Sequence, residues 1–369
     1  MTPSVLHVSQ PVDGGVARYV GEAAADQAAR GWSVAVAAPA EGPLPRELAA
    51  RGVACLPWEA TRSPGPATLR EARALAAVVA GFAPDVVHLH SAKAGLAGRL
   101  ALRGRIPTIF QPHGWSWLAC DGPMASASAA WERLAARWTD ALVCVGDGEA
   151  AQGWGAGIRH PLVVIRNGVD PARFVPADVV GRATARGKLG LPLGAPLAVC
   201  VGRLTRQKGQ DVLLDAWPAV RRRCPDAVLA LVGDGDLRAA LERVAGPGVV
   251  FAGPAADVRP WYAAADLVVL PSRWEGLPLI ALEALASGRS VVGTDIPGLA
   301  EVLTPEVGAL VPPDDTTALT AALARRLGHP PLVWDEGQAA VIRAKEFDLR
   351  VTLDLLAELT SATARRPCA

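Results

Sequence analysis

The chain has 369 residues, of which 51% are hydrophobic and 20% charged, and its formal net charge is +1. This composition is typical of a globular protein long enough for two domains, and it excludes a disordered chain. The near-zero charge gives no support to nucleic-acid binding, which usually shows a basic domain. No apolar run approaches the roughly 18 residues of a membrane helix, so no membrane-spanning segment is expected.

The N-terminal stretch, residues 1–8, lacks the basic and apolar regions of a signal peptide and is predicted to form a first strand. The six cysteines are scattered and contain no C-x-x-C pair, so we expect reduced thiols in a cytoplasmic protein. Lysine occurs at only four positions, which makes Lys208 less easily explained as a general surface residue.

Short β-rich apolar runs alternate with segments of helical period along the whole chain. The predicted strands are Val5–Val8, Val34–Ala38, Val53–Pro57, Val86–His90, Pro107–Phe110, Ala141–Val145, Leu162–Ile165, Leu197–Val201, Val228–Val232, Val249–Ala252, Leu267–Leu270, Val291–Gly293 and Gly308–Val311. Such alternation predicts an α/β protein with parallel sheets covered by helices. So many strands are improbable in one open sheet, so two doubly wound domains are predicted.

Residues 167–194 are rich in Pro, Gly and Asp and contain no clear strand. We therefore place the domain boundary there, with an N-terminal domain at 1–168, a C-terminal domain at 169–345 and a final helical segment at 346–369. Doubly wound domains bind ligands at the carboxyl ends of their strands. Two such domains facing each other across a cleft would carry their chemistry in the loops that follow strands.

Two features of the first domain deserve a chemical interpretation. Asp13-Gly14-Gly15 follows the first strand and opens a helix, where paired glycines let backbone N–H groups approach an anion; a plain tight turn is the alternative. His88 and His90 lie two residues apart on one strand and hence on one face. The sequence shows no evident third ligand beside them, so we interpret them as buried structural histidines rather than as a metal site.

His113 follows the strand predicted at 107–110 and lies at the end where a ligand is expected. It is a candidate for substrate contact, and a loop-capping role is the alternative. Trp115 and Trp117 come next and alternate along the chain. They are interpreted either as one core residue and one that stacks on an acceptor, or as two core anchors.

In the second domain, Gly202, Arg203 and Lys208 lie between the end of a strand and the start of a helix. Cations beside the N–H groups of a helix N-terminus bind a diphosphate without a metal ion and stabilise it as a leaving group. Asp234 follows the next strand and is a candidate for bordering a nucleoside. Asp236 is predicted to cap the helix after it.

The most informative stretch is 272–288. A loop leads into a helix predicted over Leu279–Ser287 and ended by Gly288. This helix is apolar on every side except at Glu283, and a buried carboxylate requires a hydrogen-bond donor as partner. Glu275 lies eight residues earlier, in the loop. Two acceptors for hydroxyl groups with a positive helix end between them suit a nucleotide sugar.

Together these residues resemble the family 4 retaining glycosyltransferases, which have the GT-B fold of two Rossmann-like domains facing across a cleft. The resemblance covers nearly the whole chain, and its most specific signal is the pair Glu275 and Glu283 with Arg203 and Lys208 upstream. Further matches are Gly14-Gly15, His113-Gly114, Asn167-Gly168-Val169-Asp170 with Phe174, Gly202, Gly209, Gly233-Asp234-Gly235 and Val307-Gly308 to Pro313.

The resemblance implies a role for each part. Residues 1–168 would be the acceptor-side domain, 169–345 would bind the nucleotide sugar, and the last helix, about 349–361, would cross back to the first domain. Glu283 would hold the ribose hydroxyls and Glu275 would contact the transferred sugar, with His113 nearby. The diphosphate would be bound by Arg203, Lys208 and the Gly15 amide. The remaining donor-binding residues implied are Gly14, Gly202, Asp234, Gly276, Leu277, Leu279 and Ile280, and the acceptor-binding ones are Trp115 and Trp117.

One departure concerns the loop. Leu277-Pro278 stands where Phe-Gly is frequent in the family, and Pro278 has no N–H, so one expected amide contact to the donor is missing. The departure affects the identity of the sugar, not the fold. No metal or other cofactor is implied, and the co-substrate expected from the resemblance is a UDP-sugar.

The implied reaction moves a hexose-type sugar to an acceptor hydroxyl of a small molecule, a natural-product precursor or a saccharide. The leaving diphosphate oxygen helps to deprotonate the acceptor, which attacks the same face, so no protein nucleophile is needed. Two alternatives use the same fold: a nucleotide-sugar 2-epimerase, which would need cleft carboxylates that the N-terminal half does not show, and a non-catalytic nucleotide-sugar-binding protein. A Rossmann oxidoreductase is disfavoured because the G-x-G-x-x-G fingerprint is missing.

Overall fold

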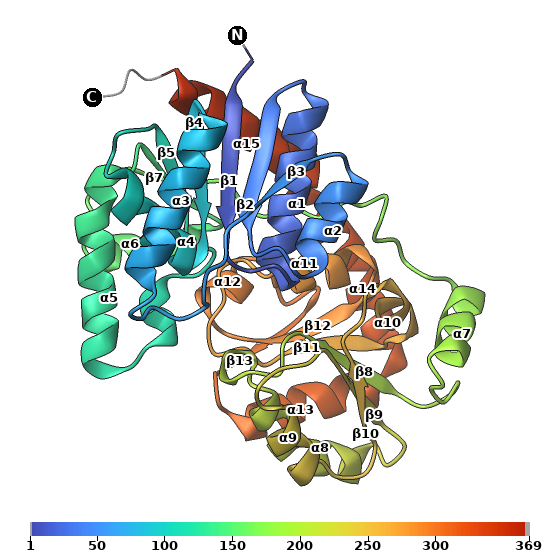
Figure 1. The fold of residues 1–369 in the computed structure, drawn as a ribbon. Helices are drawn as coiled ribbons and strands as arrows, with labels where there is room; N and C mark the ends of the chain where they lie inside the picture. The colour runs from blue at the N-terminus through green and yellow to red at the C-terminus, as the bar shows by residue number, and fades with distance from the viewer. Residues whose placement is uncertain (1, 366–369) are drawn as a thin grey trace. The chain divides into compact units, whose positions relative to one another are not determined.

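The computed structural model of the protein describes residues 2–365, so Cys368, one of the six expected thiols, lies outside the described residues. The chain divides into two compact units. Unit 1 runs to Arg166 and resumes at Val351, and unit 2 comprises Asn167–Arg350. Each unit is built on one sheet whose strands all pair in parallel (Figure 1). The cysteines between residues 2 and 365 are all free thiols.

The sheet of unit 1 has the strand order β3-β2-β1-β4-β5-β6-β7. Its strands are β1 (Ser4–Ser9), β2 (Ser33–Ala38), β3 (Ala54–Pro57), β4 (Val86–His90), β5 (Thr108–Gln111), β6 (Ala141–Cys144) and β7 (Leu162–Val164). The helices are α1 (Gly14–Ala29), α2 (Pro43–Ala50), α3 (Thr68–Phe82), α4 (Ser91–Leu102), α5 (Gly122–Ala135) and α6 (Asp147–Gly155), joined by α15 (Leu349–Ala364) from Val351 onward.

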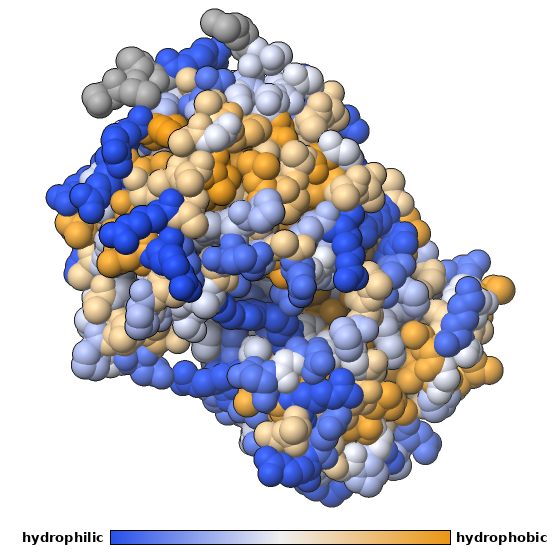
Figure 2. Space-filling view, viewed as in Figure 1, coloured by the Kyte–Doolittle hydropathy of each residue, from blue (hydrophilic) through white to orange (hydrophobic). Residues whose placement is uncertain are grey.

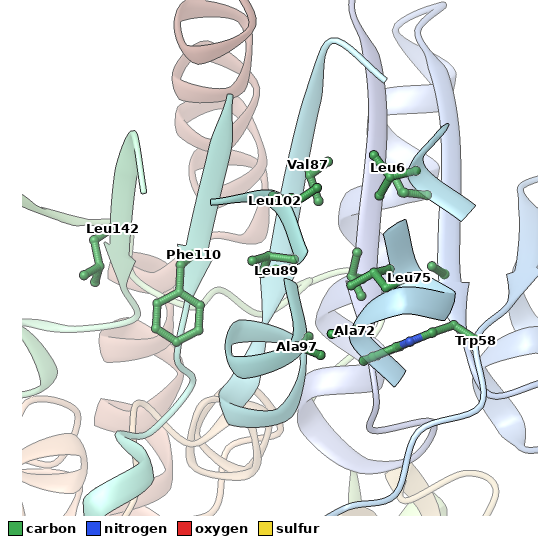
Figure 3. Packing of buried hydrophobic residues seen from close by; sticks show 14 of the residues in the cluster. Leu6, Trp58, Ala72, Leu75, Val87, Leu89, Ala97, Leu102, Phe110 and Leu142 are labelled. Carbon is green, nitrogen blue, oxygen red and sulfur yellow. The ribbon is translucent and has the colours of Figure 1, made fainter. Parts of the chain in front are cut away.

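Alternating side chains of these strands enter different cores on the two faces of the sheet. Leu6 of β1 packs in a cluster with Leu75 of α3 and Ala97 of α4, as Figure 3 shows. Its neighbour Val5 belongs to a second cluster with residues of α1 and with Leu356 of α15. Because both faces are covered, the strands read as nearly continuous apolar runs rather than as alternating patterns.

Unit 2 repeats this plan with the strand order β10-β9-β8-β11-β12-β13. Its strands are β8 (Leu197–Val201), β9 (Val228–Val232), β10 (Val249–Gly253), β11 (Leu267–Leu270), β12 (Ser290–Thr294) and β13 (Gly308–Val311). Its helices are α7 (Val179–Lys188), α8 (Gln210–Arg223), α9 (Arg238–Val244), α10 (Arg259–Ala264), α11 (Leu279–Ala286), α12 (Pro297–Ala300), α13 (Thr316–Leu327) and α14 (Pro330–Ala344). Single 3₁₀ turns occur at η1 (Ser116–Ala119), η2 (Ala136–Trp138), η3 (Arg206–Lys208) and η4 (Lys345–Phe347).

The structure confirms every predicted strand, with ends that differ by at most one residue. The predicted helix after Pro278 is α11, and Gly288 follows it with a left-handed φ of 68°. In each sheet the order reverses beside the first strand of the unit, between β1 and β4 and between β8 and β11. Such a switch point leaves a crevice at the carboxyl ends of the two strands, which is where open α/β sheets bind ligands.

No helix within residues 2–365 combines the length and the apolar character needed to cross a membrane. On the face seen in Figure 2, hydrophilic residues interrupt the hydrophobic ones. Many of the buried apolar side chains are collected in clusters within each unit.

Candidate functional site

The switch point of unit 2 brings together the two loops that carry most of the predicted donor-binding residues. Lys208 ends the turn η3 after β8, and Glu275 lies in the loop after β11. The two loops are in backbone contact at Gly209. Its φ is 65°, and a Cβ there would lie 1.9 Å from the carbonyl oxygen of Pro271. The position therefore requires glycine both for its left-handed conformation and for the close backbone approach.

Glu275 is buried and held by several donors. One carboxylate oxygen, Oε1, accepts a hydrogen bond of 2.8 Å from the Ser272 hydroxyl and forms an ion pair with Lys208 Nζ. The Gln207 amide reaches the other oxygen at 3.5 Å and donates to the Trp274 carbonyl at 3.0 Å. A cation and a carboxylate are thus fixed side by side, 67 residues apart in the sequence. Ser272 and Gln207 were not identified from the sequence.

Glu283 lies on α11 and is only 2% exposed. Its Oε2 accepts a hydrogen bond of 2.8 Å from the hydroxyl of Tyr262, a fully buried residue of α10. The structure thus confirms that this carboxylate has a hydrogen-bond donor as partner. The sequence did not identify Tyr262, because the partner of a buried group on one helix can come from any element packed against it.

The loop that leads into α11 is held from several directions. Pro278 is the N-cap residue and provides no side-chain cap, so the first N–H groups of the helix are not satisfied by a capping side chain. The Asn167 amide donates to the Leu277 carbonyl at 2.7 Å. A Cβ on Gly298, in α12, would lie 1.6 Å from the Gly276 carbonyl oxygen, so these two backbones are in contact. The donor contacts of Gly276, Leu277, Leu279 and Ile280 stay predictions.

Gly202, Arg203 and Asp234 lie at the ends of the neighbouring strands β8 and β9. A Cβ on Gly233 would lie 2.0 Å from the Gly202 carbonyl oxygen, so these two strand ends also meet backbone to backbone. The Asp234 carbonyl accepts from Leu204 N–H at 2.9 Å. Arg203 is half-buried on the same loop as Lys208. The structure places these residues at the carboxyl ends of two neighbouring strands, and their roles stay predictions.

The capping prediction for Asp236 is wrong. The N-cap of α9 is Leu237, and no side chain caps the helix. The turn is closed by the backbone, with Arg238 N–H donating to the Gly235 carbonyl at 3.1 Å. The Asp234 side chain accepts from the Gly235 N–H at 2.8 Å, which is the local alternative open to an aspartate in a turn.

In unit 1 the first candidate is the start of α1. Gly14 has a φ of 72°, a conformation that glycine adopts without strain, and a Cβ would meet nothing within 4 Å. Gly14 and Gly15 are exposed, and the N-cap Asp13 makes no side-chain hydrogen bond to the helix. The first N–H groups of α1 are therefore not occupied by a cap, as an anion-binding helix N-terminus requires.

A cluster of four histidines lies at the switch point of unit 1. His7 Nδ1 lies 2.9 Å from His90 Nε2, and His90 Nδ1 lies 3.1 Å from His113 Nε2. His7 Nε2 contacts the Gln27 side-chain oxygen at 2.8 Å. His88 stacks on His90 with ring centroids 3.9 Å apart. The expectation that His88 and His90 lack a third partner is wrong, because β1 places His7 beside them.

Burial keeps these imidazoles neutral. It lowers the pKa of His7 to about 4, against the small opposing effect of the Gln27 hydrogen bond, and it lowers the pKa of His113 to about 3. The pKa values of His88 and His90 are also well below their usual range, first through burial and then through the neighbouring rings. Within residues 2–365, His7, His88 and His90 are the one group whose nitrogens are close enough to bind a metal ion together.

The loop after β5 holds His113 in an unusual backbone conformation. Its φ is 54°, in the left-handed region that costs a non-glycine residue energy. The buried Glu149 of α6 fixes the loop, with one carboxylate oxygen accepting from the Gly114 N–H and the other from the Val145 N–H at 2.7 Å. The Tyr19 ring meets the imidazole edge-on at 5.0 Å. Glu149 and Tyr19 were missed from the sequence.

The two tryptophans that follow have different environments. Trp115 is 1% exposed in the core of unit 1, and its indole N–H donates to the Glu149 carbonyl at 2.7 Å. Trp117 stacks on it with centroids 4.6 Å apart and remains partly exposed. The acceptor-binding prediction for Trp115 is therefore corrected to a core role, because a buried ring with a satisfied N–H has no face left for a ligand. Trp117 stays a candidate.

The chain is similar to known proteins in both sequence and fold. A family model described as Glycosyltransferase Family 4 matches residues 13–173, and one described as Glycosyl transferases group 1 matches residues 195–329. A D-inositol 3-phosphate glycosyltransferase from Xylanimonas cellulosilytica is 31% identical over 325 residues, which cover 77% of this chain and 73% of that protein. The chain belongs to glycosyltransferase family 4.

Other family 4 relatives are matched over a smaller share. A GDP-mannose-dependent alpha-(1-6)-phosphatidylinositol monomannoside mannosyltransferase from Mycolicibacterium smegmatis is 39% identical over 178 residues, 44% of this chain and 46% of that protein. The chain spans about half the length of this and similar mannosyltransferases, between 46% and 59%.

The fold agrees with the family. The structure superposes on sucrose-phosphate synthase from Thermosynechococcus elongatus with a TM-score of 0.83 and 23% identity, covering 98% of each chain. At this identity the likeness concerns the fold alone. The two Rossmann-like units are those of the GT-B fold that the resemblance implied.

Proposed function

We propose that the protein is a retaining glycosyltransferase that moves a hexose from a nucleotide sugar to the hydroxyl group of a small-molecule or saccharide acceptor. The observation that carries this proposal is the set of loops at the switch point of unit 2. There Lys208 and Glu275 are held in contact, and the buried Glu283 follows on the helix that begins from the same loop. Family membership supports the same conclusion.

The chemistry of each group fits one part of a nucleotide sugar. Glu283 is already anchored through one oxygen by Tyr262 and can accept hydroxyl protons of a ribose. Lys208, which is 17% exposed, can contact a diphosphate with its remaining protons. Glu275 can accept a sugar hydroxyl. A lysine that is pre-positioned by a carboxylate stabilises the negative charge that develops on the leaving diphosphate without reorganising at the moment of reaction.

The reaction requires no protein nucleophile in this proposal. The leaving diphosphate takes up the acceptor proton, and the acceptor attacks the face that the diphosphate leaves, so the anomeric configuration is retained. The three histidines that could bind a metal ion are not among the groups that we propose to contact the diphosphate, and Lys208 supplies the positive charge instead. We therefore expect transfer to continue in EDTA.

The donor base is the next question. The UDP-sugar expected from the sequence rests on the resemblance alone, whereas the name of one relative specifies GDP-mannose. The names of other relatives, an inositol phosphate glycosyltransferase and an alpha-maltose-1-phosphate synthase, indicate phosphorylated polyols or sugars as acceptors to test first. The scattered free thiols fit a reaction in the reducing cytoplasm.

A thermal-shift screen of UDP, GDP and their hexose conjugates tests the first step, because a ligand that binds the folded state raises the apparent stability. The stabilising donor is then incubated with acceptors, and the product is analysed by NMR for its anomeric configuration. A retained configuration supports the proposal. Inverted product, a change of sugar configuration without acceptor, or tight binding with no turnover towards any acceptor or water would each contradict it, the last two favouring an epimerase or a binding protein.

A further inference from the structure

The histidines of unit 1 form a directed chain. Gln27 in α1, His7 in β1, His90 in β4 and His113 after β5 are joined by contacts of 2.8, 2.9 and 3.1 Å, in that order. His7 and His90 use both of their ring nitrogens in this chain. Among the described residues, His113 uses its Nε2 only, so its Nδ1 is left for a ligand.

The direction of the chain follows from counting protons. A neutral imidazole has one N–H donor and one lone pair, so each of the three rings contributes one proton to the three contacts. The Gln27 oxygen can only accept, so His7 carries its proton on Nε2. Its Nδ1 then accepts from His90 Nε2, and His90 Nδ1 accepts from His113 Nε2. The open Nδ1 of His113 is therefore a lone pair.

We propose that Gln27, His7 and His90 are positioning residues that hold His113 in the Nε2–H tautomer, so that its Nδ1 can accept a hydrogen bond from a hydroxyl group of a ligand bound at this face of unit 1. This inference rests on the proposed function for the identity of the ligand, but the tautomer itself does not depend on it. An isolated neutral imidazole can carry its proton on either nitrogen. The series of hydrogen bonds from Gln27 to His113 selects one of these two tautomers.

Several features make the chain suited to this role. His7 and His90 are completely buried, so water does not compete for their nitrogens. The strained φ of 54° at His113 and the Glu149 clamp on Gly114 hold the ring at the end of the chain. Strain of this kind is concentrated at functional sites. The hydrogen bond to Gln27 in α1 therefore determines the tautomer of a histidine in a loop that starts more than eighty residues later.

His88 provides a matched control inside the same cluster. It is completely buried and stacks on His90, and it is not a member of the hydrogen-bonded series Gln27, His7, His90 and His113. A His88→Leu variant therefore removes a buried imidazole without breaking the chain of hydrogen bonds.

Replacing Gln27 by Met keeps the length of the side chain and removes the acceptor. A buried His7 N–H would then be unpaired, which is more costly than an unpaired lone pair, so the chain should reverse and leave His113 with Nδ1–H.

The test begins with the unsubstituted protein. Histidine labelled with ¹⁵N is examined by long-range ¹H–¹⁵N correlation, which distinguishes the two tautomers, with signals assigned by single substitutions. We expect His7, His90 and His113 all to be Nε2–H tautomers, and His88→Leu to leave them unchanged. Gln27→Met should convert His113 to Nδ1–H. An Nδ1–H tautomer of His113 in the unsubstituted protein would overturn the inference, as would tightly bound metal with the imidazoles as ligands.

Kinetics then link the tautomer to the ligand. With the donor found in the screen, Gln27→Met should lower kcat/KM by roughly three- to tenfold, the value of one neutral hydrogen bond. His88→Leu should change it by less than about twofold, because His88 makes none of the three hydrogen bonds that fix the tautomer, and a double substitution with Gln27→Met measures any coupling through its stacking on His90. If the tautomers are as expected but no donor is turned over, the proposed function fails and the positioning chain stands. If turnover is normal in a folded Gln27→Met protein whose tautomer has reversed, the ligand contact is refuted.

Discussion

Acidification should destabilise unit 1 before unit 2, because four of the six histidines of the chain lie in one cluster of unit 1. The sign follows from the direction of the pKa shift. Burial lowers the pKa of His7 from 6.5 to about 4, so the folded form binds fewer protons than the unfolded chain between these values. The resulting stability is complete above pH 6.5 and is lost as the pH falls towards 4.

His7 alone gives a usable magnitude. At pH 5 the unfolded chain holds nearly a full proton on His7 and the folded chain about a tenth of one, so moving from pH 7 to pH 5 costs about 2 kcal/mol. The lowered pKa values of His88, His90 and His113 act in the same direction. A loss of this size is a large part of the free energy of unfolding of a typical domain, which is roughly 5–15 kcal/mol. Ordinary carboxylates titrate lower and contribute little in this range.

Hydrogen exchange by mass spectrometry can follow the two units separately. After correction for intrinsic exchange rates, the protection of β1 should fall by about thirtyfold or more between pH 7 and pH 5, since about 1.4 kcal/mol corresponds to a factor of ten. Strand β8 is the internal control, because the histidine of unit 2 within the described residues, His329, is exposed. A His88→Leu variant should show a smaller loss. Equal pH responses of β1 and β8 would refute the reasoning.

Three further predictions concern single side chains. Lys208→Ala should lower turnover by about a hundredfold or more, because the contact to the leaving diphosphate is lost. The control Lys188→Ala, at an exposed position, should leave the rate unchanged. A folded Lys208→Ala enzyme with normal activity would exclude the assignment. Glu283→Ala should weaken binding of the free nucleoside diphosphate in calorimetry. Glu275→Ala, which also releases Lys208, should weaken it less and mainly impair transfer, and the opposite pattern would mean that the two roles are exchanged. Trp115→Ala should lower the free energy of unfolding by about 3–5 kcal/mol as a core truncation, and a stable variant with altered acceptor affinity would restore a binding role.

The elements of the fold were predictable because their signals are local. Most strands are short apolar runs, many of them rich in valine, such as Val228–Val232. The sequence was sufficient to predict that Lys208 and Glu275 lie close together, since both follow strands that flank a switch point. Their direct ion pair could not, because both had been assigned to a ligand.

The partners inside the units were not predictable from the sequence. The proximity of His7 to His88 and His90 has no signal in the sequence, because parallel pairing brings β1 beside β4 from about eighty residues away. Tyr262 and Glu149 satisfy groups on other elements through contacts that have no fixed spacing in the chain. Asp236 does not cap α9, because a backbone hydrogen bond closes the turn before this helix without a side-chain cap.

The backbone contacts of Gly209, Gly233 and Gly298 limit how this protein could be re-engineered. At each of these positions an added methyl group would lie 2.0 Å or less from a carbonyl oxygen of a neighbouring loop or strand end. A library designed to change the donor preference should therefore leave these glycines fixed and vary Gln207, whose side chain contacts Glu275 in the same pair of loops. Variation concentrated on the conspicuous glycines would mostly sample misassembled proteins.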